Sequence, residues 1–260
     1  MQSKTPTILA LDFDGVICDG LLEYFQTAWR TYCQIWQPSQ QTPPPGLEEI
    51  FYRLRPVIET GWEMPVLIRA LLLGISEEKI LQSWVSIASQ LLVEENLQAK
   101  DIGEKLDSLR DEWIARELTD WLSYHRFYPG VIERLQQAIA LAVKIVIITT
   151  KEGRFVCQLL QQAGIELPPG YIFGKELQRT KHYILRELLE KNTETQTIWF
   201  VEDRLKTLQV IKQQPELKNV RLFLADWGYN TLVERESVKQ DPRIKLLSLS
   251  QFTGDFSTWP

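Results

Sequence analysis

Apolar residues follow two different spacings along the chain and divide it into three stretches. Short runs of apolar and β-branched residues, which are typical of buried strands, occur at 8–11 and again from residue 143 onward. Between them, from residue 21 to about residue 125, apolar residues recur every three or four positions, as in amphipathic helices. The pattern therefore predicts a helical block inserted into a chain that otherwise alternates strands with helices.

The alternating stretches predict strands at 8–11, 143–149, 171–173, 198–201, 220–225 and 244–249. Helices are expected between the later strands, at 131–140, 153–164, 181–189 and up to about residue 212. Strands that alternate with helices in this order predict an α/β fold with a doubly wound parallel sheet. In the inserted block we expect helices at 21–36, 47–55, 61–73, 76–94 and 101–117, and a short one from Asp120.

The order of these segments also predicts the domain organisation. A chain of 260 residues is long enough for one or two domains. Because the first strand precedes the helical block, we expect residues 1–19 and 127–260 to form one α/β core domain. Residues 20–126 are expected to form a helical domain inserted into it.

Two carboxylates follow the first strand directly. Asp12 and Asp14 are two residues apart, so their side chains point the same way on an extended chain, and Gly15 allows a turn. Sites in open α/β sheets lie beyond the carboxyl ends of the strands. Such a pair suits Mg²⁺, and one aspartate can attack phosphorus while its neighbour transfers a proton. A turn or a helix cap is the alternative interpretation of Asp-x-Asp-Gly.

The stretch 11–19, Leu-Asp-Phe-Asp-Gly-Val-Ile-Cys-Asp, resembles the first sequence motif of the haloacid dehalogenase-like (HAD) superfamily. The resemblance implies a Rossmann-like core with an inserted all-helical cap of the C1 type. It also implies that Asp12 is the nucleophile and that Asp14 is the general acid and base. A cap of this type excludes water from a site and selects substrates.

Two later positions match the second and third motifs of the family. Thr149 ends a predicted strand and is followed by Thr150 and Lys151, where many members have asparagine and lysine. Lys181 leads a predicted helix and fits the spacing of the family better than Lys175 does. The resemblance implies that Thr149 and Lys181 are catalytic and that Gly15, Thr149, Thr150 and Lys181 bind the phosphoryl group. A lysine there offsets negative charge at the reacting centre.

The fourth motif is expected at Glu202 and Asp203, directly after a predicted strand. Glu202 stands where glycine is commonest in the family, and Thr207 stands near the usual place of a distal aspartate. The form of the motif with an acidic pair is therefore the better match. The resemblance implies a Mg²⁺ site formed by Asp12, Asp14, Asp203 and Glu202, with Glu202 as a ligand or as an acceptor beside one.

The expected cap contains two candidate substrate-binding residues, Arg53 and Arg55, which lie near Glu59 and Glu63 in the sequence. Arginine binds carboxylate and phosphate groups well, so these side chains suit an anionic substrate. Ion pairs on the surface or within the fold are the alternative interpretation.

Charge and composition limit the partners of the protein. The net charge is −5 with no lysine-rich block, which argues against nucleic acid. The apolar run at 8–11 is too short to span a membrane, no signal peptide is recognisable, and Cys18, Cys33 and Cys157 lack metal or disulfide spacing. We expect a cytoplasmic monomer or homodimer with no nucleic-acid or membrane partner. Cys18 is expected to be a small buried hydrophobe.

Together, these expectations predict a Mg²⁺-dependent phosphatase that hydrolyses a small phosphorylated metabolite through an aspartyl-phosphate intermediate. A phosphomutase that resembles β-phosphoglucomutase is one alternative. A catalytically silent HAD-fold protein with a binding or regulatory role is another. A 2-haloacid dehalogenase is disfavoured, because those enzymes generally lack the second aspartate, here Asp14, and need no Mg²⁺.

Overall fold

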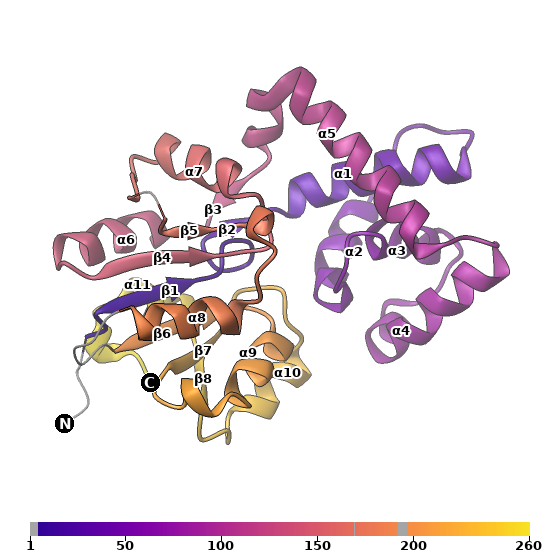
Figure 1. The fold of residues 1–260 in the computed structure, drawn as a ribbon. Coiled ribbons are helices and arrows are strands. Elements are labelled where there is room, and N and C mark those ends of the chain that lie inside the picture. Colours follow the sequence, from indigo (N-terminus) through magenta and orange to yellow (C-terminus); the bar gives the residue numbers. More distant parts are fainter. Residues whose placement is uncertain (1–4, 169, 192–196) are drawn as a thin grey trace. The chain divides into compact units, whose positions relative to one another are not determined.

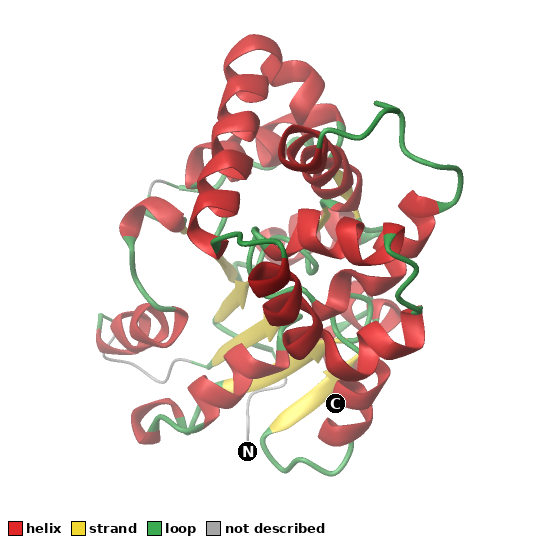
Figure 2. Cartoon of the chain, turned by 90° about the vertical axis from the view of Figure 1, so that its right-hand side faces the viewer, coloured by secondary structure: helices red, strands yellow, loops and turns green. Residues whose placement is uncertain are grey.

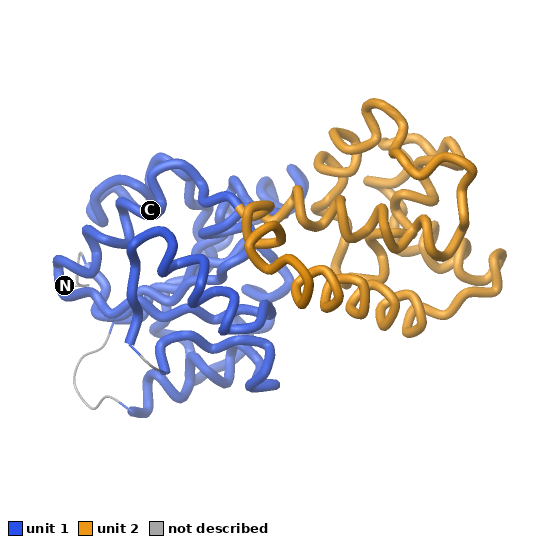
Figure 3. The backbone as a smooth tube through the Cα atoms, turned by 90° about the horizontal axis from the view of Figure 1, so that it is seen from above, with its two compact units in different colours: residues 1–19, 126–260 blue, residues 20–125 orange. Residues whose placement is uncertain are grey.

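The computed structural model describes residues 5–168, 170–191 and 197–260 (Figure 1). The chain forms two compact units, coloured separately in Figure 3. Unit 1 contains residues 1–19 and 126–260, and unit 2 contains residues 20–125. The inserted unit ends at residue 125, one residue before the expected end at residue 126. The difference arises because Arg126 pairs with Asp19 in a short antiparallel ladder of unit 1.

Unit 1 is built around a six-stranded sheet in the order β5-β4-β1-β6-β7-β8, in which every neighbouring pair is parallel. Figure 2 shows the strands side by side, with helices around them. The predicted doubly wound α/β fold is confirmed. The strands are β1 (Ile8–Leu11), β4 (Lys144–Ile148), β5 (Ile172–Phe173), β6 (Ile198–Glu202), β7 (Arg221–Ala225) and β8 (Ile244–Leu247).

β1 occupies an inner position of the sheet, and all four of its residues are buried. Leu11 lies opposite Ile147 of β4 and opposite Val201 of β6. The chain continues to β4 on one side of β1 and later to β6 on the other side, so the strand order reverses at β1. Ligands in open α/β sheets bind at such a reversal, beyond the carboxyl ends of the strands.

One face of the sheet packs against α8 (Lys181–Glu190) and α9 (Leu205–Lys212). Both helices contribute buried residues to one apolar cluster that includes alternate strand residues such as Ala10, Val146 and Phe200. Successive side chains of a strand point to opposite faces, so the intervening residues pack on the other side. Burial on both faces explains why these strands read as continuous apolar runs.

The opposite face packs against α6 (Val131–Ala140) and a cluster of aromatic rings near the C-terminus. The ring of Trp199 lies 5.3 Å from that of Trp259, and the ring of Phe223 lies 5.1 Å from that of Trp259, between centroids. This cluster fixes the last residues of the chain onto the sheet.

The end of the last strand corrects the sequence prediction. The expected strand 244–249 ends at Leu247, because the Ser248 side chain accepts a hydrogen bond from the backbone N–H of Gln251 and starts α11 (Leu249–Thr253). Such a capping box is a typical helix start. α7 (Gly153–Gln162) and α10 (Leu232–Val238) complete the longer helices of the unit.

The structure describes all of residues 20–125, and helices joined by loops are the only regular secondary structure of this unit, so the all-helical insert is confirmed. Its aromatic and aliphatic residues, among them Phe25, Phe51 and Trp84, form a core of its own. No helix within the described residues is both long and apolar enough to cross a membrane. The helices are α1 (Leu21–Trp36), α2 (Leu47–Leu54), α3 (Glu63–Leu72), α4 (Glu77–Glu94) and α5 (Ala99–Ser123).

α5 contains both helices expected at 101–117 and from Asp120. Glu117 has non-helical backbone angles, with φ of −143° and ψ of 59°, and marks a kink where the two helical segments meet. The sequence thus located the interruption, which is a kink and not a loop.

A buried carboxylate joins α1 to α5 within unit 2. Glu23 is fully buried and accepts hydrogen bonds from the Thr27 hydroxyl at 2.7 Å, from Arg110 Nε at 2.8 Å and from Trp121 Nε1 at 3.2 Å. A buried charge is tolerated only when it is paired and hydrogen-bonded in this way.

We expect Glu23→Gln to lower the free energy of unfolding by about 2–4 kcal/mol, because the Arg110 guanidinium loses its buried counter-charge. Urea unfolding measures the change. The matched control is Glu104→Gln, whose ion pair with Lys100 is exposed and should change stability by less than about 0.5 kcal/mol. Equal effects of the two substitutions would contradict a role for the buried pair.

Candidate active site

The candidate site lies at the edge of the sheet where the inner strands of unit 1 end. β1 ends before Asp12, β4 ends before Thr149, and β6 ends at Glu202, which Asp203 follows. The backbone N–H of Asp12 still donates to the Val201 carbonyl at 3.0 Å, so the two strand ends remain in register. Residues far apart in the sequence therefore meet at one edge of the sheet.

Lys181, the first residue of α8, places its ammonium group between two carboxylates. Its Nζ atom lies 2.9 Å from Asp12 Oδ1 and 2.7 Å from Glu202 Oε2. Little of these three side chains is exposed, so solvent screens the ion pairs weakly. Lys175, the competing candidate, is exposed in the short helical turn Lys175–Leu177.

Backbone N–H groups hold the two acids that follow β6. Glu202 Oε1 accepts from the N–H groups of Asp203 at 3.2 Å and Arg204 at 3.0 Å. Asp203 Oδ2 accepts from the N–H of Tyr229 at 2.8 Å. The side chain of Asn230 donates to the Asp203 carbonyl at 2.8 Å and fixes the loop after β7 against these acids. The Trp-Gly-Tyr sequence of this loop resembles a turn at the same place in many HAD members and was the available signal for its position.

Burial raises the pKa values of the carboxyl groups. Burial and the charge of Glu202 raise the pKa of Asp12 to about 7, against the effect of Lys181. Burial raises the pKa of Glu202 against Lys181, and burial together with Asp12 raises the pKa of Asp203. Burial alone would lower the pKa of Lys181, but Asp12 and Glu202 outweigh it and hold that pKa above its ordinary value. One cation thus leaves the negative charge of the site incompletely compensated.

Asp12, Glu202 and Asp203 form an acidic cluster in which the nearest oxygen atoms all lie within 4.8 Å of one another. Hard carboxylate oxygens suit Mg²⁺, and a divalent cation would offset both the burial and the mutual repulsion that raise their pKa values. Both oxygens of Glu202 already accept hydrogen bonds, which favours Asp12 and Asp203 as direct ligands. The Asp14 carboxylate is not part of this cluster and lies beside Lys151, and the expected role of Asp14 as a metal ligand stays a prediction.

Lys151 is a charged residue of the site that the sequence analysis did not select. Its Nζ atom lies 3.3 Å from Asp14 Oδ1, and both side chains are largely buried. Its position directly after Thr149 and Thr150, where the chain leaves β4, was the available signal.

The two threonines after β4 differ in exposure. Thr149 is buried, and its hydroxyl accepts a hydrogen bond from the backbone N–H of Lys151 at 3.1 Å. Thr150 is exposed. The predicted contact of these residues with a phosphoryl group stays a prediction, and Thr149 lies at the strand end where the sequence placed it.

The loop after β1 is folded tightly against the acids. Gly15 has a φ of 86°, and a Cβ atom there would lie 2.3 Å from Asp203 Oδ2. A Cβ atom on Gly228 would lie 2.5 Å from the Gly15 carbonyl oxygen. Cys18, whose carbonyl accepts from the Gly15 N–H at 2.8 Å, is fully buried, and burial raises the pKa of its thiol, so it stays protonated.

Arg53 and Arg55 both have partners inside unit 2. Arg53 forms an exposed ion pair with Glu77 at 2.7 Å. Arg55 donates to the Ile58 carbonyl at 3.0 Å, and its guanidinium lies 5.0 Å from the ring centroid of Tyr24. These contacts are of the kind expected if the two arginines have a surface or structural role. Their role in substrate binding stays a prediction.

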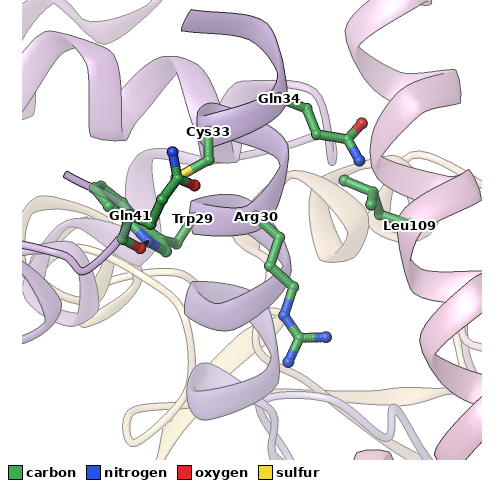
Figure 4. Close-up of a pocket in the computed structure, with 6 residues that line it drawn as sticks. All are labelled: Trp29, Arg30, Cys33, Gln34, Gln41 and Leu109. Carbon is green, nitrogen blue, oxygen red and sulfur yellow. Dashed lines mark hydrogen bonds between the residues drawn. The ribbon is translucent and has the colours of Figure 1, made fainter. Parts of the chain in front are cut away.

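A pocket of about 300 Å³ lies within unit 2, between α1 and α5 (Figure 4). Trp29 Nε1 donates to the Gln41 carbonyl at its wall, at 2.8 Å. The pocket has no acidic lining residue and shares no residue with the acidic cluster of unit 1, so we do not assign the chemistry to it. Its lining residues are Trp29, Arg30, Cys33, Gln34, Gln41 and Leu109.

A family model described as haloacid dehalogenase-like hydrolase matches residues 6–213. The chain belongs to this family. A search of curated proteins found no match. The HAD resemblance inferred from the motifs is confirmed, and the matched range contains Asp12, Asp14, Lys181 and the acidic pair after β6.

Solved structures share the fold at low identity. A predicted phosphatase from Clostridium acetobutylicum is 13% identical, with a TM-score of 0.58 and coverage of 96% of this chain and 97% of that chain. A predicted phosphoglycolate phosphatase from Haemophilus somnus is 13% identical, with a TM-score of 0.60 and coverage of 99% and 97%. A HAD-like family protein from Streptococcus pneumoniae is 12% identical, with a TM-score of 0.54 and coverage of 94% of each chain.

We expect Gly15→Ala to weaken Mg²⁺ binding at least about tenfold and to destabilise the protein by about 2–4 kcal/mol, since the new methyl group displaces the Asp203 carboxylate. Calorimetric Mg²⁺ titration and urea unfolding measure the two effects. Gly46→Ala is the matched control: its φ is 84°, and nothing lies within 4 Å of its Cβ position. The control should show only the backbone cost of about 1–2 kcal/mol. Unchanged Mg²⁺ binding in Gly15→Ala would contradict the site.

The raised pKa of Asp12 predicts a pH-dependent stability in chelator. Burial favours the protonated Asp12 carboxyl group, so this group stabilises the fold fully below pH 3.8, which is its pKa in the unfolded chain. The stabilisation is lost as the pH rises through about 7, the pKa in the folded protein. Asp12→Asn removes the titration. The stability of the variant relative to the wild type should therefore increase by about 1–3 kcal/mol from about pH 5 to about pH 8. Urea unfolding at each pH measures it. Asp111→Asn, at an exposed position, should show no such trend, and a constant difference for Asp12→Asn would contradict the prediction.

Proposed function

We propose that this HAD-like hydrolase is a Mg²⁺-dependent phosphatase that hydrolyses a small phosphomonoester through an aspartyl-phosphate intermediate. The observation that carries the proposal is the position of Lys181, whose ammonium lies 2.9 Å from Asp12 at the edge of the acidic cluster. A carboxylate nucleophile and a phosphoryl group are both anionic, so their approach needs fixed positive charge. Two of the solved structures with this fold are described as a phosphatase and a phosphoglycolate phosphatase, which supports the same class of reaction.

Asp12 is the nucleophile in this proposal. One of its oxygens forms a bond to phosphorus, and the bond from phosphorus to the ester oxygen breaks. The electron pair of that bond goes to the leaving oxygen, which takes a proton from the Asp14 carboxyl group. The backbone N–H of Phe13 donates to Asp12 Oδ1 at 2.8 Å and, together with Lys181, fixes the orientation of the nucleophile.

The second step returns the enzyme to its starting state. Asp14, now a carboxylate, takes a proton from water while the water oxygen bonds to phosphorus. The bond between phosphorus and Asp12 breaks, its electron pair restores the Asp12 carboxylate, and inorganic phosphate leaves. Lys181 stays charged throughout, because its pKa is held above the ordinary value, and it offsets the charge on the phosphoryl oxygens.

The metal ion belongs to the same proposal. Asp12 and Asp203 would hold Mg²⁺, and Glu202 would accept hydrogen bonds beside it while positioning Lys181. When bound, Mg²⁺ neutralises negative charge on the transferring phosphoryl group. The Tyr229 N–H keeps the Asp203 carboxylate in place.

Phosphate release from a panel of small phosphomonoesters tests the proposal. We expect turnover with Mg²⁺, its loss in chelator, and a fall of at least about 10³-fold in kcat for Asp12→Asn, because the amide cannot form the acyl phosphate. Asp111→Asn is the control and should keep wild-type activity. Full activity in Asp12→Asn would refute the nucleophile. Turnover without net phosphate release, detected as an isomeric phosphoester by NMR, would identify a phosphomutase.

A further inference from the structure

We propose that Lys151 is a positioning residue that holds the Asp14 carboxyl group in the orientation needed for proton transfer. The inference rests on the proposed phosphatase reaction and gives a role to the lysine that directly follows Thr149 and Thr150 of the second motif. It concerns the geometry of Asp14 and not the binding of the phosphoryl group.

The other carboxylates of the site are each fixed by a hydrogen-bond donor. Asp12 accepts from the Phe13 N–H, Glu202 accepts from Lys181, and Asp203 accepts from the Tyr229 N–H. Asp14 Oδ1 is buried and accepts no hydrogen bond within the described part of the chain. The structure gives this oxygen an ion pair with Lys151 at 3.3 Å. The ammonium group of Lys151 therefore holds Asp14, as hydrogen-bond donors hold the other three acids.

The backbone of Lys151 is fixed on both sides. Its N–H donates to the Thr149 hydroxyl at 3.1 Å, and its carbonyl accepts from the N–H of Lys175 at 3.0 Å. The side chain is only 10% exposed, whereas lysine side chains in most proteins lie in solvent. A buried lysine on a fixed backbone loses little further freedom when it pairs with Asp14, so it is suited to orient that group.

Close packing fixes the neighbouring loop as well. The Gly153 N–H donates to Glu176 Oε2 at 3.0 Å. A Cβ atom on Gly174 would lie 2.3 Å from the Gly153 nitrogen, so the segments after β4 and β5 touch through two glycines. Lys151 is thereby anchored to two loops of unit 1.

A positioning role makes a specific kinetic prediction. Asp14 gives its proton to the leaving oxygen when the phosphorus–oxygen bond breaks. An alkoxide needs that proton, whereas p-nitrophenolate is stable without it. If Asp14 loses its fixed orientation, the hydrolysis of alkyl phosphates should therefore slow. The attack of Asp12 on p-nitrophenyl phosphate should be almost unaffected.

The test compares Lys151→Met with the wild-type enzyme on p-nitrophenyl phosphate and on the alkyl phosphate that the panel ranks first. We expect kcat for the alkyl phosphate to fall about 10- to 100-fold with KM nearly unchanged. Phosphoryl transfer from p-nitrophenyl phosphate to Asp12, followed as the p-nitrophenol burst in a single turnover, should change less than about threefold. Lys151→Arg, which keeps the charge, should recover part of the lost activity.

Two controls separate this role from a general loss of structure. Lys175→Met removes an exposed lysine from the adjacent loop and should leave both substrates at wild-type rates. In an Asp14→Asn background, Lys151→Met should cause no further loss on the alkyl phosphate, because a residue that acts through Asp14 has nothing left to position.

Three results would overturn the inference. They are equal losses of kcat on both substrates, a rise in KM without a change in kcat, or full additivity with Asp14→Asn. Each of them requires a wild-type enzyme that turns over both substrates and loses turnover in Asp12→Asn. Absence of wild-type turnover on every substrate would instead mark the failure of the proposed function, and it would overturn both.

Discussion

The ion pairs of Lys181 with Asp12 and Glu202 are the interaction on which the candidate site depends. Removing a charged group from water costs several kcal/mol, and this site buries three carboxylates at the end of adjoining strands. The ammonium group and the backbone N–H groups at Phe13, Tyr229 and the start of α9 offset that cost. These contacts do not cancel the cost of burial, which is the main reason that the pKa values of the carboxyl groups stay raised, and the proposed divalent cation would add positive charge to the same site.

The sheet places these groups with little help from local sequence. β1 pairs with β4 and with β6, so the carboxyl ends of three strands fix Asp12, Thr149 and the acidic pair along one edge. The loop after β7 reaches the same edge, where the tight contacts of Gly15 and Gly228 leave no room for a side chain. The chemistry of the site thus depends on backbone geometry as much as on the acids themselves.

The sequence predicted the fold and the inner strands because a strand buried on both faces needs a continuous apolar run. It also favoured Lys181 over Lys175, because Lys181 directly leads a predicted helix and fits the motif spacing of the family. It could not reveal the pairing of Lys151 with Asp14, which depends on the exact path of the chain after β4. α10 was missed for a different reason: Leu232 and Val233 are exposed, so the segment has no apolar face in its sequence pattern. The strands β2 (Cys18–Asp19) and β3 (Arg126–Phe127) have two residues each, which is too short for an alternating pattern of apolar residues to be recognised in the sequence.

The inner position of β1 has a consequence for the order in which the protein is made. The strand is synthesised before unit 2, whereas both of its partners, β4 and β6, follow the whole of unit 2. Unit 2 is one continuous segment with a core of its own, so it can fold while the rest is still being synthesised. Until residue 148 has been synthesised, the apolar segment Ile8–Leu11 has neither of its partner strands. Asp12 waits longer, because Glu202 and Asp203 follow it by about 190 residues, so a product of synthesis that ends before residue 203 lacks the acidic cluster.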